Sequence, residues 1–99
     1  MAGRREHGIE STAPLFAALG DSMRLRLVAQ LCDGGPQSIV RLTVGVELTR
    51  QGVTKHLRVL ANAGLIHGTR RGRESLWTID LRQLDVARRD LDLMSERWN

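Results

Sequence analysis

The chain has 99 residues and a formal net charge of +4, which favours a single domain whose small core would gain from oligomerisation. Its only cysteine, Cys32, excludes an intramolecular disulfide and a cysteine-based metal quartet within one chain, and 3% aromatic content disfavours surfaces that stack single-stranded bases. Short apolar runs and the lack of a signal-peptide core predict a soluble, cytoplasmic protein with no membrane partner.

The polar, aperiodic residues 1–11 predict a flexible arm ahead of the helical part of the chain. The first helix is expected to start with Ser11 or Thr12 as its N-cap and to hold Pro14 in its first turn, where a missing N–H costs nothing. It stops at Gly20, because glycine readily adopts the backbone conformations that end a helix.

Two further helices are predicted before residue 46. One runs from a cap at Asp21 or Ser22 to Gly34, and its apolar residues recur at helical spacing, so it belongs to the core. A short helix capped by Ser38 follows, and Gly45 permits a tight turn after it.

The fourth helix is predicted from Thr49, its cap, to about Ala63, and Gly64 ends it. One stripe of this helix is apolar and consists of Val53, Leu57, Leu60 and Ala61. The opposite stripe is polar, carries two cations and no anion, and consists of Gln51, Thr54, Lys55, Arg58 and Asn62. Gly52 costs about 1 kcal/mol in helix propensity, and either a close approach to a neighbour or simple drift explains it.

Beyond Gly64 the period of the sequence changes from that of a helix to that of strands. Segments Leu65–Arg70 and Glu74–Ile79 predict a two-stranded hairpin around Gly72, with arginines crowded at its tip. Asp80 then caps a long last helix. Its apolar residues follow the heptad spacing of a helix that packs on a partner helix, and they are Leu84, Ala87, Leu91, Met94 and Trp98.

Positive charge is concentrated in one quarter of the chain. Residues 49–73 hold six basic residues and no Asp or Glu, whereas the rest of the chain holds nine basic and eleven acidic residues. An acid-free stretch of this kind is the electrostatic footprint of a polyanion partner. A solvated charged face is the alternative, although such faces usually mix both signs.

This order of elements predicts a mainly α, winged helix-turn-helix fold with a three-helix DNA-binding core, a two-stranded β-hairpin wing and a long C-terminal dimerisation helix. The polar face of the fourth helix can meet base edges in the major groove, because a helix is about as wide as that groove. The hairpin arginines can reach phosphates or a narrow minor groove alongside. We therefore divide the single domain into an arm (1–11), a DNA-binding part (12–80) and a dimerisation helix (81–99).

Three segments, taken in order, resemble the ArsR-type family of winged-helix bacterial repressors: FAALGDSMRLRLVAQL, TRQGVTKHLRVLANAGLI and GTRRGRESLWTI. The resemblance covers roughly residues 13–80 and is specific because the segments occur together. It implies a homodimer that pairs through its first and last helices, binds double-stranded operator DNA and blocks transcription. It also implies DNA contacts at Thr54 and Lys55, and a subgroup without obvious metal ligands.

The predicted DNA contacts lie on the fourth helix and at the hairpin tip. They are Thr49, Arg50, Gln51, Thr54, Lys55, His56, Arg58, Arg70, Arg71 and Arg73. Gln51 suits the recognition of adenine, and Arg58 or Arg50 suits guanine or phosphate. The predicted dimer contacts are Leu15, Phe16, Leu84, Ala87, Leu91, Met94 and Trp98. No arrangement of Ser, His and Asp suggests catalysis, so an enzyme is not expected.

The resemblance also raises the question of metal sensing. The thiolate pair of arsenic and cadmium sensors would fall near Ser38 and Val40, where there is no cysteine, and residues 80–98 lack the histidines that zinc and nickel sensors place on the last helix. No metal site and no cofactor are therefore predicted. We expect Cys32 to be buried as a small hydrophobe, with redox sensing as the alternative, and His56 to support its helix or to touch phosphate.

Two rival functions use the same fold. A winged helix that binds protein would expose a hydrophobic face on the fourth helix, whereas this face is basic. A protein that binds RNA or organises DNA without sequence preference would bind random duplex as tightly as an operator. We expect a homodimeric repressor with two fourth helices in successive major grooves, about 10 base pairs apart on an imperfect palindrome. Its control by a small organic effector, a partner protein or autoregulation stays open.

Overall fold

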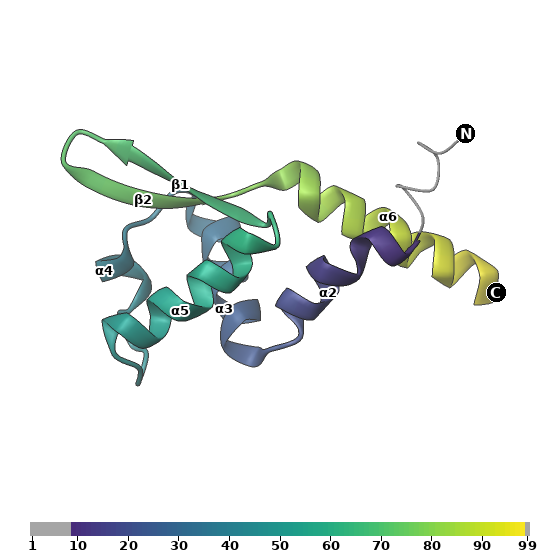
Figure 1. Cartoon of the computed structure of the whole chain (residues 1–99), viewed down its shortest axis with the longest axis horizontal. Coiled ribbons are helices and arrows are strands. Elements are labelled where there is room, and N and C mark those ends of the chain that lie inside the picture. The colour runs from purple at the N-terminus through teal and green to yellow at the C-terminus, as the bar shows by residue number, and fades with distance from the viewer. Residues whose placement is uncertain (1–8, 99) are drawn as a thin grey trace.

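The structure is a computed structural model, and it describes residues 9–98 of the chain. The elements in chain order are η1 (Ile9–Thr12), α2 (Ala13–Leu19), α3 (Ser22–Gly34), α4 (Ile39–Leu42), α5 (Arg50–Asn62), β1 (Ile66–Arg71), β2 (Glu74–Ile79) and α6 (Leu81–Trp98). Along the long axis, α4, the start of α5 and the hairpin turn lie at one end, and the end of α6 lies at the other (Figure 1). The predicted winged helix-turn-helix architecture is confirmed.

Three helices begin at side-chain caps that the sequence predicts. Asp21, Ser38 and Thr49 each accept a hydrogen bond from the backbone N–H three residues ahead, at 3.0, 3.3 and 3.0 Å. Each cap satisfies a donor that has no partner within the first helical turn. Thr12 differs, because its backbone is already helical (φ −96°, ψ −3°) and its side chain makes no cap bond.

The core lies where α3, α4 and α5 meet the start of the hairpin. Its largest fully buried apolar side chains are Leu27, Leu31, Leu42, Val53, Leu57, Leu60, Leu65 and Ile66. Each contributes about 1.5–3 kcal/mol when it is removed from water, so this cluster holds α5 firmly against α3 and α4. The apolar stripe predicted for the fourth helix is therefore confirmed as its inner side.

The wing is an antiparallel hairpin that is anchored to the loop before α4. Its register runs from Ile66↔Ile79 to Arg71↔Glu74, so the strand predicted at 65–70 is displaced by one residue. Gly72 has a φ of 62°, which suits the first turn position between strands joined by two residues. Gln37 and Trp77 exchange two backbone hydrogen bonds of 3.0 and 2.8 Å, which tie the base of the wing to the helical core.

The last helix, α6, packs against η1 and α2. Asp80 caps it as predicted, accepting from the backbone N–H of Arg82 at 3.0 Å. The hydroxyl of Thr12 donates to Oδ2 of Asp90 at 2.5 Å, and both residues are buried. Of the predicted arm at 1–11, residues 1–8 lie outside the described part, and the remaining three belong to η1.

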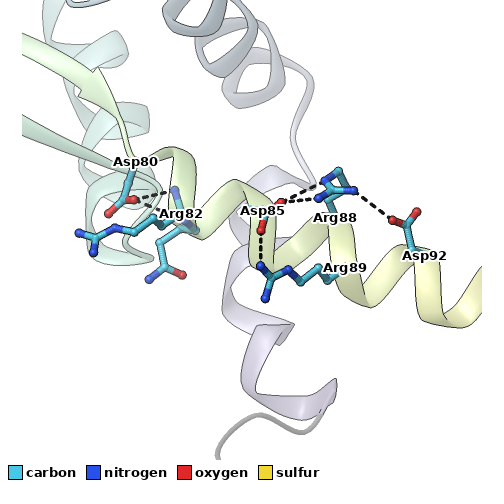
Figure 2. A network of polar contacts seen from close by, with 7 residues as sticks. Asp80, Arg82, Asp85, Arg88, Arg89 and Asp92 are labelled. Carbon is cyan, nitrogen blue, oxygen red and sulfur yellow. Dashed lines mark hydrogen bonds and ion pairs between the residues drawn. The ribbon is translucent and has the colours of Figure 1, made fainter.

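The outer side of α6 carries charges that neutralise one another (Figure 2). Arg88 contacts Asp85 at 2.5 Å and Asp92 at 3.2 Å, and Arg89 contacts Asp85 at 2.9 Å. The hydrogen bond from Arg88 lowers the pKa of Asp85 below its ordinary value, and the charges of both arginines add to this effect. Helical periodicity places these residues on the side of α6 away from Ala87.

Candidate nucleic-acid interface

The outward side of α5 carries a cluster of polar side chains, which we call the basic face. It lines a shallow hollow in the surface and consists of Arg50, Gln51, Thr54, Lys55 and Arg58. Each residue rotates by about 100° around a helix, so Gln51, Thr54 and Arg58 follow the middle of the basic face. Arg50 and Lys55 fall on its two edges. The direction of this face is set by the opposite stripe, where Val53, Leu57 and Leu60 have no exposed surface.

The cations of the basic face and of the wing form no ion pair among residues 9–98, although Glu74 lies opposite Arg71 in the hairpin. Within residues 9–98, the ion pairs join arginines of α6 to aspartates of α6, and His56 to Asp21. Arg70, Arg71 and Arg73 are exposed at the end of β1 and in the turn that follows it. Unneutralised cations on exposed surface attract a polyanion, whereas Arg88 and Arg89 of α6 are paired with aspartates of the same helix.

Two of the predicted DNA contacts have structural roles. Thr49 caps α5 through its hydroxyl oxygen. His56 lies on the flank of α5 that faces α3, where its Nδ1 is 3.3 Å from Nη1 of Arg24 and 3.7 Å from Oδ2 of Asp21. The backbone N–H of Arg24, followed by the charges of Arg24 and His56, lowers the pKa of Asp21. His56 therefore supports the helix, which is one of its two predicted roles, and does not belong to the basic face.

The predicted dimer contacts divide into a covered and an exposed group. Leu15 and Ala87 are only 4% exposed within the single chain, so they cannot offer much surface to a partner. Phe16 and Leu84 are partly buried against the same core. Leu91 and Met94, farther along α6, are 53% and 40% exposed. The predicted contact at Trp98 falls on a side chain outside the described part of the molecule.

Sequence reasoning missed Arg24 and Asp90. Arg24 donates from Nε to the carbonyl oxygen of Ala18 at 2.6 Å and also reaches His56, so it connects α2, α3 and α5. Asp90 lies on the same side of α6 as Ala87, where it meets Thr12. Asp90 interrupts the apolar stripe of α6, and an acidic residue at such a position predicts a buried hydrogen-bond donor as its partner.

Cys32 is exposed, which corrects the expectation that it would be buried. It follows Leu31 by one residue, and the resulting rotation of about 100° carries it beyond the buried arc of α3.

Among residues 9–98, no three His, Cys, Asp or Glu side chains are grouped to hold a metal ion. No helix in that part of the chain has both the length and the apolarity needed to cross a membrane.

The sequence matches no family model, but it is similar to known regulators. The HTH-type transcriptional regulator YuzN of Bacillus subtilis is 35% identical over 65 residues, which cover 60% of this chain and 71% of YuzN. An ArsR-like transcriptional regulator from a Rhodococcus species is 31% identical, with a TM-score of 0.75 over 88% of this chain and 81% of the other. The chain belongs to the ArsR family of transcriptional regulators.

Another relative of this ArsR-family protein is the arsenical resistance operon repressor of Bacillus subtilis. It is 32% identical over 65 residues, which cover 66% of this chain and 62% of the repressor. These relatives are transcriptional regulators rather than enzymes. The resemblance assigns the thiolate ligands of arsenic sensors to the region of Ser38 and Val40. In this chain Ser38 is a helix cap and Val40 is an exposed apolar residue, so neither supplies a thiolate.

Proposed function

We propose that this regulator is a homodimeric, sequence-specific DNA-binding repressor of the bacterial cytoplasm that occludes its promoter. One observation carries the DNA-binding part: the cations of the basic face of α5 are exposed, the face contains no acidic residue, and its cations form no ion pair within residues 9–98. A helix held from behind by buried leucines can enter the major groove with this face toward the bases. Arg70, Arg71 and Arg73 would reach the adjacent phosphates or minor groove.

Edges and middle of the basic face would then have different tasks. Arg50 and Lys55 are long cations on the edges, where the phosphates that border the groove are closest. Gln51, near the start of α5, is placed for base edges, since the N-terminal residues of a recognition helix make those contacts. Its amide matches the donor and acceptor of adenine. Edge contacts would give affinity and register, and the middle of the face would give sequence preference.

The proposal of a homodimer rests on a change in exposure along the apolar stripe of α6. Ala87 of the stripe is buried within the single chain, where α6 packs against η1 and α2. Beyond that, Leu91 and Met94 continue the same stripe in solvent. A second copy would present the same stripe, so a two-fold contact of the two helices would cover both. It would also set the spacing between two α5 helices on DNA.

The DNA-binding proposal is tested by selection and competition. Wild-type protein is used to select duplexes from a random-sequence library, and the selected duplex then competes with random duplex. We expect the selected duplex to win clearly and the double charge reversal K55E/R58E to abolish binding. A variant with two reversed charges on α6, R82E/R89E, should bind normally. Equal affinity for selected and random duplex would favour a non-specific DNA organiser, and binding retained in K55E/R58E would exclude α5 as the recognition helix.

The homodimer is tested with two variants of one helix. Leu91 and Leu93 are 53% and 50% exposed, but they point to different sides of α6. Leu91→Asp would bury a charge in the proposed contact and should give monomers in sedimentation velocity measurements. Leu93→Asp introduces the same charge outside the stripe and should remain dimeric. A dimer that survives Leu91→Asp but not Leu93→Asp would place the contact on the other side of α6.

A further inference from the structure

Thr54 occupies a special place on the basic face. It lies along the middle line with Gln51 and Arg58, between the cations at the two edges, and it contributes to the hollow that they line. It is also in the first half of α5, where recognition helices approach base edges. Because its side chain is short, Thr54 can contact DNA only if α5 lies deep enough in the groove to approach the base edges.

The hydroxyl of Thr54 is already engaged within the helix. It donates its proton to the carbonyl oxygen of Arg50 at 2.8 Å. This bond selects one side-chain rotamer and turns the oxygen toward the preceding turn. A hydroxyl has a single proton, so Thr54 has no donor left for the acceptors N7, O6 and O4 that bases present in the major groove. Its oxygen can still accept from the amino groups of adenine or cytosine, and its methyl group adds an apolar surface for contact with the DNA.

We infer that Thr54 is a specificity-determining residue whose methyl group packs on the C5-methyl of a thymine in each operator half-site. This inference rests on the proposed function, in which α5 enters the major groove. The thymine methyl is the apolar group of the major-groove surface, and a threonine methyl complements it by shape and by exclusion of water. With Gln51 on adenine beside it, the basic face would read an A·T-containing step.

The test removes one methyl group from each side of the contact. In the duplex selected by the wild-type protein, each thymine is replaced in turn by 2′-deoxyuridine, which lacks only the methyl. Dissociation constants are measured by fluorescence anisotropy for wild type, Thr54→Ser and Thr54→Val. Serine keeps the hydroxyl and loses the methyl, whereas valine loses the hydroxyl and keeps a methyl. Both residues have helix propensities close to that of threonine, so both variants should fold.

We expect one thymine per half-site at which deoxyuridine weakens wild-type binding about fourfold, the value for one buried methyl group. Thr54→Val should keep this difference and Thr54→Ser should abolish it, because the coupling belongs to the two methyl groups. If no thymine is sensitive, or if Thr54→Ser retains the full penalty, the inference is overturned while the proposed function stands. If selection yields no preferred duplex, the proposed function fails first and the inference fails with it.

Discussion

Replacing Lys55 with glutamine should change the salt dependence of DNA binding by a definite amount. Lys55 lies at one edge of the basic face, about 140° around α5 from Arg50, and forms no ion pair within residues 9–98. If each of the two subunits neutralises three phosphates, log K falls against log salt with a slope of about −5.4. Loss of one phosphate contact from each of two subunits should bring the slope to about −3.6.

The assay is anisotropy titration of the selected duplex at several salt concentrations between about 50 and 200 mM. The matched control is Arg89→Gln, which also removes one positive charge but takes it from α6, where Arg89 is paired with Asp85 at 2.9 Å. Its slope should equal that of the wild type. Parallel lines for wild type and Lys55→Gln would refute the phosphate contact at Lys55. An equal change in the control would mean that net charge, rather than position on α5, governs binding.

Three further predictions concern what holds the basic face in place. Leu57→Ala should lower the free energy of unfolding by about 2–5 kcal/mol in urea titration, because Leu57 is fully buried behind the face; a loss below 1 kcal/mol would contradict this packing. Thr12→Val should cost about 1–3 kcal/mol, since it leaves the buried carboxylate of Asp90 without that donor, and an unchanged melting temperature would count against the bond. The folded-state pKa of Asp21 lies below 3.8, so its ionised form adds stability that is present above that pH and is lost as the pH falls through the lowered pKa. Asp21→Asn should therefore reduce the dependence of the free energy of unfolding on pH between about pH 5 and pH 2. An unchanged dependence would mean that other carboxylates cause it.

The two ends of the molecule differ in whether their arginines and lysines form ion pairs within the chain. On α6, Asp85 and Asp92 pair with Arg88 and Arg89 of the same helix (Figure 2). On α5 and the wing, the cations form no ion pair within residues 9–98 and are available to an external anion. The exposed part of the apolar stripe on α6 lies toward the end of the long axis away from the wing turn (Figure 1). DNA contact and subunit contact are thus proposed for different regions of one small domain.

Most element positions were predictable because their signals are local. The caps at Asp21, Ser38 and Thr49 act over three residues, and the period of apolar residues in α5 reports which side will be buried. The acid-free stretch of residues 49–73 was likewise visible without coordinates. The sequence was also sufficient to predict the winged helix-turn-helix fold and the family, since both depend on the order of such local signals.

Tertiary structure decided the features that depend on contacts between distant segments. Thr12 bonds to Asp90 across 78 residues, and Arg24 reaches His56 across 32, so neither pairing has a sequence signature. The same holds for exposure: periodicity identifies an apolar stripe but does not say which part of it the chain itself covers. By itself the sequence determined which face of α5 is basic. Only packing decided that His56 meets Arg24 and Asp21 and that the stripe on α6 emerges into solvent, because contacts and burial are properties of the assembled chain.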